Sequence, residues 1–185
     1  MSELTALRWP DQPPTHGWIV LREFRDDDVA FAQDLSTDPY VPLVGSLPAH
    51  ATRRQASDWL QRQQGRLVDG AGFSFAVADA VTNVALGQIG LWLARLPQGR
   101  AEAGYAVAPA ARGCGAAASA LQALTTFAWT IPALHRIKLY IEPTNIASVR
   151  TANRASYAWE GLLRSHQEIG SSRRDMALYA ALRPA

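Results

Sequence analysis

The sequence predicts a mixed α/β (α+β) fold in which helices cover both faces of one sheet. Its 185 residues suit a single domain, and a chain of that length can bury about 70% of its unfolded surface. A hydrophobic content of 48% and a charged content of 18% are typical of a globular protein. Apolar runs with strand or helix spacing follow one another in the order β-α-α-β-β-β-α-β-α-β-β. This order lacks the regular βαβ alternation of a doubly wound fold.

The beginning of the chain differs in composition from the rest. Residues 1–17 contain Pro10, Pro13 and Pro14 and show little periodicity, which predicts a loosely ordered N-terminal arm before a single domain at 18–185. Strands are predicted at residues 18–22, 73–77, 85–93, 102–108, 136–141, 161–168 and 176–182, the last two as a hairpin. Helices are predicted after the acidic run 26–28, after Thr52, at 116–129 and at 147–159, with a loop at 40–50.

Charge and composition exclude several classes of function. A formal net charge of +2 is too small to indicate binding to nucleic acid or an anionic membrane, despite a sequence pI of about 9.0. The single cysteine, Cys114, excludes an internal disulfide and a cysteine-based metal cluster, and the four histidines lack paired ligand spacing. No apolar run approaches the ~20 residues of a membrane span, and no signal peptide is recognisable. We therefore expect a cytoplasmic protein without a bound metal.

The motif with the clearest chemistry is the loop Arg112-Gly113-Cys114-Gly115-Ala116-Ala117, which follows a predicted strand and opens a predicted helix. Small residues let the backbone approach an anion, and the first N–H groups of the helix then point at it with the positive end of the helix dipole. The loop is therefore a candidate phosphate site.

Several interpretations of this loop compete. A mononucleotide P-loop requires Gly-Lys-Ser/Thr, whereas residues 115–117 are Gly-Ala-Ala, so that interpretation fails. The dinucleotide fingerprint matches formally at 113–118, but residues 109–112 separate it from the strand end, and the repeated βαβ unit is missing. Coenzyme A is the third candidate ligand. A tight turn of small residues without any ligand is the structural alternative.

Arg-x-x-Gly-x-Ala at 112–117 resembles the pyrophosphate-binding signature of the GCN5-related N-acetyltransferases (GNAT). Residues 102–107 resemble the fourth strand of that family, and Asn145-x-x-Ser148 resembles the start of its fourth helix. These features are similar to the RimJ/RimL-type branch, which acetylates protein N-terminal amines and small amines, and the match extends over about 18–182. The resemblance implies a mixed, mostly antiparallel central sheet with helices on both faces. It also implies transfer of an acetyl group from acetyl-CoA to a primary amine by direct attack on the thioester.

The resemblance also implies roles for particular residues. Glu102 is expected to remove the ammonium proton of the acceptor, and the backbone N–H of Val107 to stabilise the oxyanion. Ser148 is expected to protonate the leaving thiolate, because the position of the family's usual tyrosine is Ala152. The residues expected to bind the cofactor are Val107, Arg112, Gly113, Cys114, Gly115, Ala116, Ala117, Asn145 and Arg154. Those expected to wall the amine pocket are Tyr40, Trp59 and Trp92.

Other interpretations stay open at this point. Glu102 could simply pair with Arg95 or Arg100 at a strand edge, and Ser148 could serve as a helix-capping residue. A non-catalytic acyl-CoA-binding module is the alternative function, favoured by the missing tyrosine, and a nucleotide-dependent oxidoreductase is a third. A homodimer is expected only by analogy with the fold.

Overall fold

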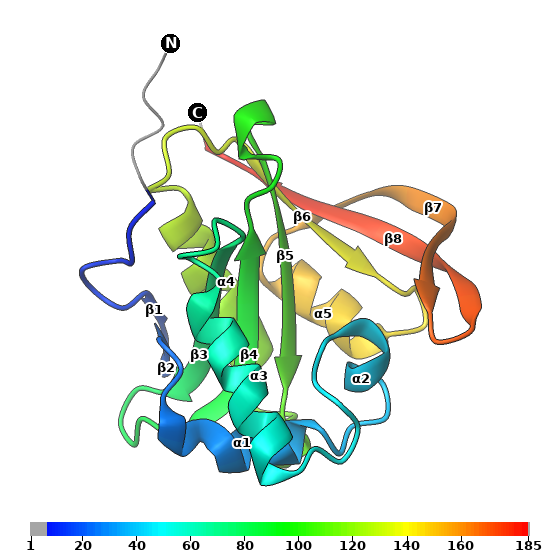
Figure 1. The fold of residues 1–185 in the computed structure, drawn as a ribbon. Helices are drawn as coiled ribbons and strands as arrows, with labels where there is room; N and C mark the ends of the chain where they lie inside the picture. The colour runs from blue at the N-terminus through cyan, green and yellow to red at the C-terminus, as the bar shows by residue number, and fades with distance from the viewer. Residues whose placement is uncertain (1–6, 185) are drawn as a thin grey trace.

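One eight-stranded sheet organises the molecule in the computed structural model, which describes residues 7–184 (Figure 1). Across the sheet the strand order is β1-β2-β3-β4-β5-β6-β8-β7. The strands are β1 (Thr15–His16), β2 (Ile19–Arg22), β3 (Gly72–Asp79), β4 (Ala85–Trp92), β5 (Arg100–Val107), β6 (Arg136–Ile141), β7 (Ala158–Ile169) and β8 (Ser172–Leu182). The helices are α1 (Val29–Leu35), α2 (Val41–Val44), α3 (Arg53–Gly65), α4 (Ala116–Ala128) and α5 (Ile146–Arg154).

The feature that positions the site is the junction of β5 and β6. All other neighbouring strands pair in antiparallel fashion, whereas β5 and β6 are parallel. Their pairing covers only residues 100–102 of β5 and 136–138 of β6. Beyond Glu102 and Lys138 the two strands diverge (Figure 1). The mostly antiparallel mixed sheet predicted from the sequence is confirmed.

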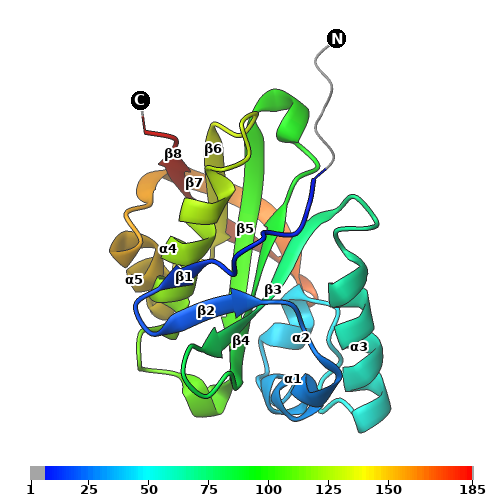
Figure 2. The ribbon, with the colours of Figure 1, turned by 90° about the vertical axis from the view of Figure 1, so that its left-hand side faces the viewer.

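Helices pack on both faces of the sheet, as expected. Figure 2 shows α4 and α5 on one side and α1, α2 and α3 on the other. Fully buried Leu121 and Leu124 anchor α4 in the larger core, together with apolar residues of β3, β4 and β6. A second core lies between α1 and α3, where the ring centroids of Phe24 and Trp59 are 5.5 Å apart. The helix α3 begins at a capping box, in which the side chains and backbone N–H groups of Thr52 and Gln55 bond reciprocally.

The N-terminal segment is attached more closely than its composition predicts. Residues 1–6 of the predicted loose arm lie outside the described residues. In the part that is described, β1 pairs with β2, and Trp9 packs on Phe75 with ring centroids 4.7 Å apart. Packing of one large, partly buried aromatic ring therefore helps to hold a proline-rich segment against the sheet.

Two other segments differ from the sequence-based prediction. The expected loop at 40–50 contains the short helix α2, which has a proline in its first turn, where the missing N–H costs little. The helix predicted to reach residue 159 ends at Arg154, because Ser156 adopts a left-handed φ of 62° that redirects the chain into β7. Between residues 7 and 184, no helix is both long and apolar enough to cross a bilayer.

Candidate active site

A large cleft opens where β5 and β6 diverge, with a volume of about 1330 Å³. Its walls come from both halves of the chain: from the turn before α2, α2 and α3 on one side, and from the loop before α4 together with α5 on the other. Of the residues predicted from sequence, those that line it are Tyr40, Trp59, Trp92, Glu102, Val107, Arg112, Gly113, Gly115, Ala116, Ala117, Asn145, Ser148 and Arg154. The fold therefore gathers widely separated residues around one space.

The loop before α4 presents its backbone to this cleft. Gly113 and Gly115 have φ values of 83° and 85°, and a Cβ on either would meet no atom within 4 Å. In the described chain, the N–H groups of residues 113–117 donate to no acceptor, since the first donors at the start of α4 are Ala118 and Ser119. Five neighbouring donors at a helix N-terminus form a favourable site for a phosphate or pyrophosphate.

Two side chains of the loop are engaged elsewhere. The Arg112 guanidinium lies 2.6 Å from the Asp38 carboxylate and donates from Nε to the Val107 carbonyl at 3.0 Å. Cys114 is the one predicted site residue that does not line the cleft; it is exposed, and its thiol donates to the Ala111 carbonyl at 3.0 Å. The loop therefore offers an anion its backbone rather than these two side chains.

The Asp38 carboxylate links this loop to the opposite wall. Besides Arg112, it accepts the N–H groups of Tyr40 and Val41, at 2.7 and 3.0 Å, at the start of α2. Burial raises the pKa of Asp38, but the Arg112 guanidinium and the two N–H donors outweigh that effect, so the pKa lies below its ordinary value. The carboxylate is thus held ionised between the two sides of the cleft.

The backbone of Val107 faces the gap between the diverging strands. The N–H of Ala108 donates to the Leu86 carbonyl at 2.9 Å, on the β4 side. Because donors alternate along an antiparallel ladder, the N–H of Val107 points to the other edge, where β6 has already diverged. This backbone donor is therefore available to a group lying in the gap.

Ser148 lies in the first turn of α5, at the same gap. Asn145 caps that helix, its side-chain oxygen accepting the Ser148 N–H at 3.1 Å. From β5, the Tyr105 hydroxyl donates to the Ser148 carbonyl at 3.2 Å, and burial raises the pKa of this tyrosine. Ala152, one turn later, is fully buried against the core, so the position of the family's usual tyrosine does not face the cleft.

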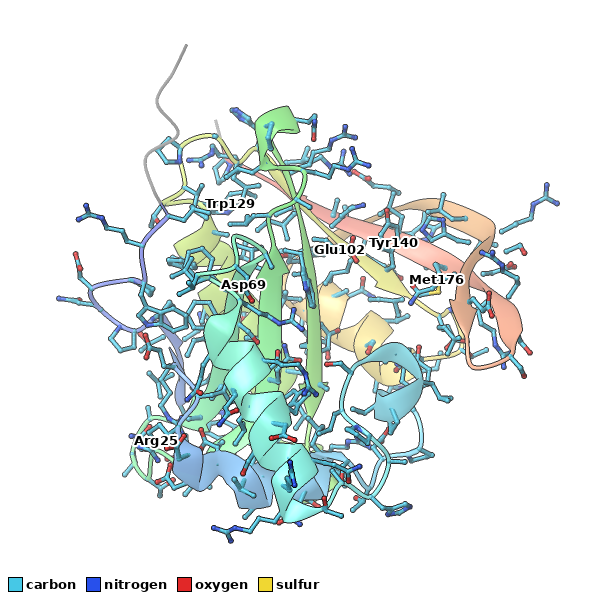
Figure 3. All side chains as sticks on the ribbon, in the orientation of Figure 1. Arg25, Asp69, Glu102, Trp129, Tyr140 and Met176 are labelled. Carbon is cyan, nitrogen blue, oxygen red and sulfur yellow. The ribbon has the colours of Figure 1, made fainter. Side chains whose placement is uncertain are left out.

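Glu102 is the last residue of β5 that pairs with β6. It faces Lys138 across the parallel pair, with a carboxylate–ammonium distance of 3.5 Å, rather than Arg95 or Arg100. Lys138 also donates to the Tyr140 hydroxyl at 2.5 Å and lies 4.4 Å from the centre of that ring. Figure 3 shows Glu102 and Tyr140 close together on these neighbouring strands. The Glu102 side chain keeps an exposed fraction of 43%, so it remains accessible from the cleft.

The three aromatic residues predicted to wall the amine pocket occupy different settings. Trp92 lies over Gly90 and Gly104 on the sheet, so close that a Cβ on either glycine would be 3.0 Å from the indole. Tyr40 contacts Glu142, and burial together with that carboxylate raises the pKa of its hydroxyl. Trp59 lines the cleft but is mainly a core residue of the α1–α3 layer, with an exposed fraction of 5%.

Several charged or hydroxyl-bearing residues near Glu102, Trp92 and Tyr40, on what we call the acceptor side of the cleft, were not predicted from the sequence. They are Arg66, directly after α3; Lys138 and Tyr140 in β6; Glu142, directly after β6; and Arg174 in β8. The alternation of residues 136–141 does place Lys138 and Tyr140 on one face of a strand. It could not show that this face adjoins Glu102, because the contact depends on the parallel pairing of β5 with β6.

These residues fit coenzyme A, the candidate ligand of the loop. The five N–H donors suit its pyrophosphate, and the gap between β5 and β6 leads from them to Val107 and Ser148. No side chain fills the space in front of Gly113 or Gly115. When bound there, acetyl-CoA supplies an activated acetyl thioester.

Comparison with known proteins agrees with this geometry. The family described as the acetyltransferase (GNAT) domain matches residues 19–157. The uncharacterized N-acetyltransferase p20 of Bacillus licheniformis is 27% identical over 165 residues, covering 89% of this chain and 93% of that protein. RimJ of Mycobacterium smegmatis, solved in complex with CoA-disulfide, is 25% identical with a TM-score of 0.77, covering 94% of this chain and 88% of that one.

A third similar structure is RimL, a ribosomal L7/L12 alpha-N-protein acetyltransferase in complex with coenzyme A. It is 19% identical, with a TM-score of 0.77, over 91% of this chain and 96% of that one. At that identity the likeness concerns the fold. The family match covers most of the chain, including the loop before α4 and Ser148. The chain therefore belongs to the GNAT acetyltransferases, on a RimJ/RimL-like branch, and is an acyl-CoA N-acyltransferase whose cofactor is acetyl-CoA.

Proposed function

We propose that the protein acetylates a primary amine, either a protein N-terminus or the amine of a small molecule, by direct attack of the amine on acetyl-CoA. The observation that supports this most is the cleft itself. It brings the anion-binding loop, the free N–H of Val107, Ser148 and Glu102 to the place where β5 and β6 diverge. RimL, which shares the fold, acts on a protein N-terminus according to its description.

In this proposal Glu102 accepts the proton of the incoming ammonium group. Its carboxylate is reachable from the cleft and lies on the sheet face that carries Trp92. Lys138, at 3.5 Å, stabilises the ionised carboxylate and fixes its position. A partly exposed carboxylate can take the proton directly or through a water molecule.

Ser148 supplies a proton to the leaving thiolate, and Val107 stabilises developing negative charge through its backbone N–H. Asn145 and Tyr105 fix the first turn of α5 by hydrogen bonds to the backbone of Ser148. The loop 112–117 and Arg154 hold the phosphates, and Tyr40, Trp59 and Trp92 shape the acceptor side. A homodimer, which size-exclusion chromatography with light scattering would test, belongs to the same proposal.

Two measurements test the proposal. Acetyl-CoA and CoA at ~100 times their dissociation constants should stabilise the fold by about 2.7 kcal/mol, whereas NAD should not. A thiol-release assay over a panel of peptides and small amines should then find an acceptor, with slower turnover in Ser148→Ala and Glu102→Gln. Binding of acetyl-CoA without thiol release from any amine would instead support the non-catalytic acyl-CoA-binding module.

A further inference from the structure

Arg66, directly after α3, is a charged residue of the cleft that the proposed chemistry leaves without a role. Its guanidinium lies over the indole of Trp92, with its central carbon 5.3 Å from the ring centroid. Both side chains line the cleft. Trp92 in turn lies directly opposite Glu102 in the β4–β5 ladder, where Cβ atoms are about 5 Å apart. Arg66 and the carboxylate proposed to receive the proton of the acceptor are therefore both neighbours of Trp92.

Near Glu102 and the turn before α2, the cations other than Arg66 have carboxylate partners, whereas Arg150 and Arg154, which line the cleft without one in the described chain, lie on α5. Lys138 pairs with Glu102, Arg112 with Asp38 and Arg174 with Glu142, at 3.5, 2.6 and 3.8 Å. Arg66 differs. Within residues 7–184, no carboxylate lies within 4.0 Å of its guanidinium, which donates no side-chain hydrogen bond.

The surroundings of Arg66 make an unpaired charge unfavourable. The side chain is half-buried, and its removal from water lowers the pKa of the guanidinium, with no neighbouring carboxylate to offset the effect. The carbonyl end of α3 supplies only partial negative charge there. A guanidinium presents donors in a planar fork that matches a carboxylate, and a partly desolvated site strengthens that interaction.

Two glycines lie beneath the Trp92 ring that Arg66 covers. Gly90 and Gly104 pair across β4 and β5, and the Trp92 ring rests on both of them. Their missing side chains let the indole approach the sheet closely, and Trp92 and Arg66 both line the cleft. An extended acceptor can therefore lie along Trp92 between Arg66 and Glu102.

From this arrangement we propose that Arg66 and Trp92 form a subsite for an acidic group of the acceptor, so that the preferred substrate is a primary amine that also carries a carboxylate. The proposal rests on the acetyltransferase function and names the chemistry of its substrate. Arg66 binds the carboxylate while the amine faces Glu102. Because Lys138 already balances the charge of Glu102, the net positive charge of this part of the cleft comes from Arg66.

Binding to the full chain saturated with CoA tests the subsite without requiring turnover. The probes are two isosteric pairs that differ in one charge: Ser-Glu-Ala amide against Ser-Gln-Ala amide, and β-alanine against β-alaninamide. We expect calorimetry to show about tenfold tighter binding of the carboxylate member in at least one pair, as a charge-assisted hydrogen bond would give. The pair that shows it distinguishes a peptide acceptor from a small amino acid.

Arg66→Met, which keeps an apolar stem over Trp92, should reduce that preference to within about twofold, and Arg66→Lys should retain part of it. Arg54→Met is the matched control, because it removes the same charge from an exposed position of α3 that does not line the cleft. The proposal is overturned if the wild type binds both members of each pair equally. It is also overturned if neither acid binds measurably. Both results come from the wild type and do not depend on the folding of a variant. A preference that survives in Arg66→Met also overturns it. Failure of the acetyltransferase proposal is separate, since it would appear as absence of thiol release with every amine.

Discussion

The two walls of the cleft are built in different ways. On the cofactor side, the proposed binding groups are consecutive backbone N–H donors of one loop, residues 113–117, at the start of α4. On the acceptor side, the groups are side chains such as Arg66, Trp92 and Tyr140, which come from separate parts of the chain. A site made of consecutive backbone groups can be recognised in a sequence. A site assembled from distant side chains cannot, because its composition depends on how the strands pair.

Ser148→Ala should have the largest effect on turnover. It should leave binding at both walls of the cleft nearly unchanged. The loss of a general acid typically lowers turnover by about 100-fold or more, whereas stabilisation by CoA should not change. A thiol-release assay with the best amine measures the first quantity and thermal unfolding the second. Ser57→Ala, on α3 and outside the cleft, is the control. Near-normal turnover in Ser148→Ala would remove this serine from the chemistry.

Gly115→Ala tests the backbone wall, with Gly70→Ala as a matched control. Both glycines have positive φ, 85° and 72°, and a Cβ on either would meet no atom within 4 Å. Both variants should therefore incur about 1 kcal/mol of backbone strain. Only Gly115→Ala places a methyl group in front of the loop donors, so CoA affinity should fall about tenfold in that variant alone. Titration of the thermal shift against CoA concentration measures this. Equal affinities in the two variants would show that the anion binds elsewhere.

Asp38→Asn tests the link between the two walls through the pH dependence of stability. The pKa of Asp38 in the folded protein lies below its ordinary value of 3.8. The carboxylate therefore stabilises the fold above pH 3.8, and this contribution is lost as pH falls through the folded-state pKa. The variant should be less stable at pH 7 by about 1–2 kcal/mol and should show a shallower loss of stability below pH 4. Urea unfolding between pH 3 and 7 measures both. Parallel pH profiles would contradict the assignment.

Gly104→Ala should have the smallest effect on activity. The effect should be limited to binding of the amine on the acceptor side. The new Cβ would lie 3.0 Å from the Trp92 indole, which must then tilt away from the sheet. We expect the KM for the amine to rise about threefold, because each misplaced contact contributes little, while CoA affinity stays constant. Steady-state kinetics at saturating acetyl-CoA separate the two quantities. A change in CoA affinity instead would show that the two walls are coupled through β5.

Most secondary structure could be predicted because its signals are local. The Thr52 capping box, the acidic run before α1 and the alternation of residues 136–141 each act within a few residues of the chain. The misplaced boundaries have non-local causes. Trp9 is held by the aromatic residues of β3, and α5 ends early because Ser156 turns the chain toward pairing with β8.

The sequence by itself determined the form of the proposed anion-binding loop, since small residues, positive φ at glycine and a helix start are properties of neighbouring residues. It also determined that Glu102 and Ser148 belong to elements flanking that loop. Only the tertiary structure decided the partner of Glu102, because Lys138 reaches it through the short parallel pairing of β5 and β6. The same holds for Arg66, whose position over Trp92 and whose lack of a carboxylate depend on the packing of α3 against the sheet. Neighbouring residues therefore define the proposed acetyl-CoA loop, whereas long-range packing decides which side chains surround the proposed acceptor site.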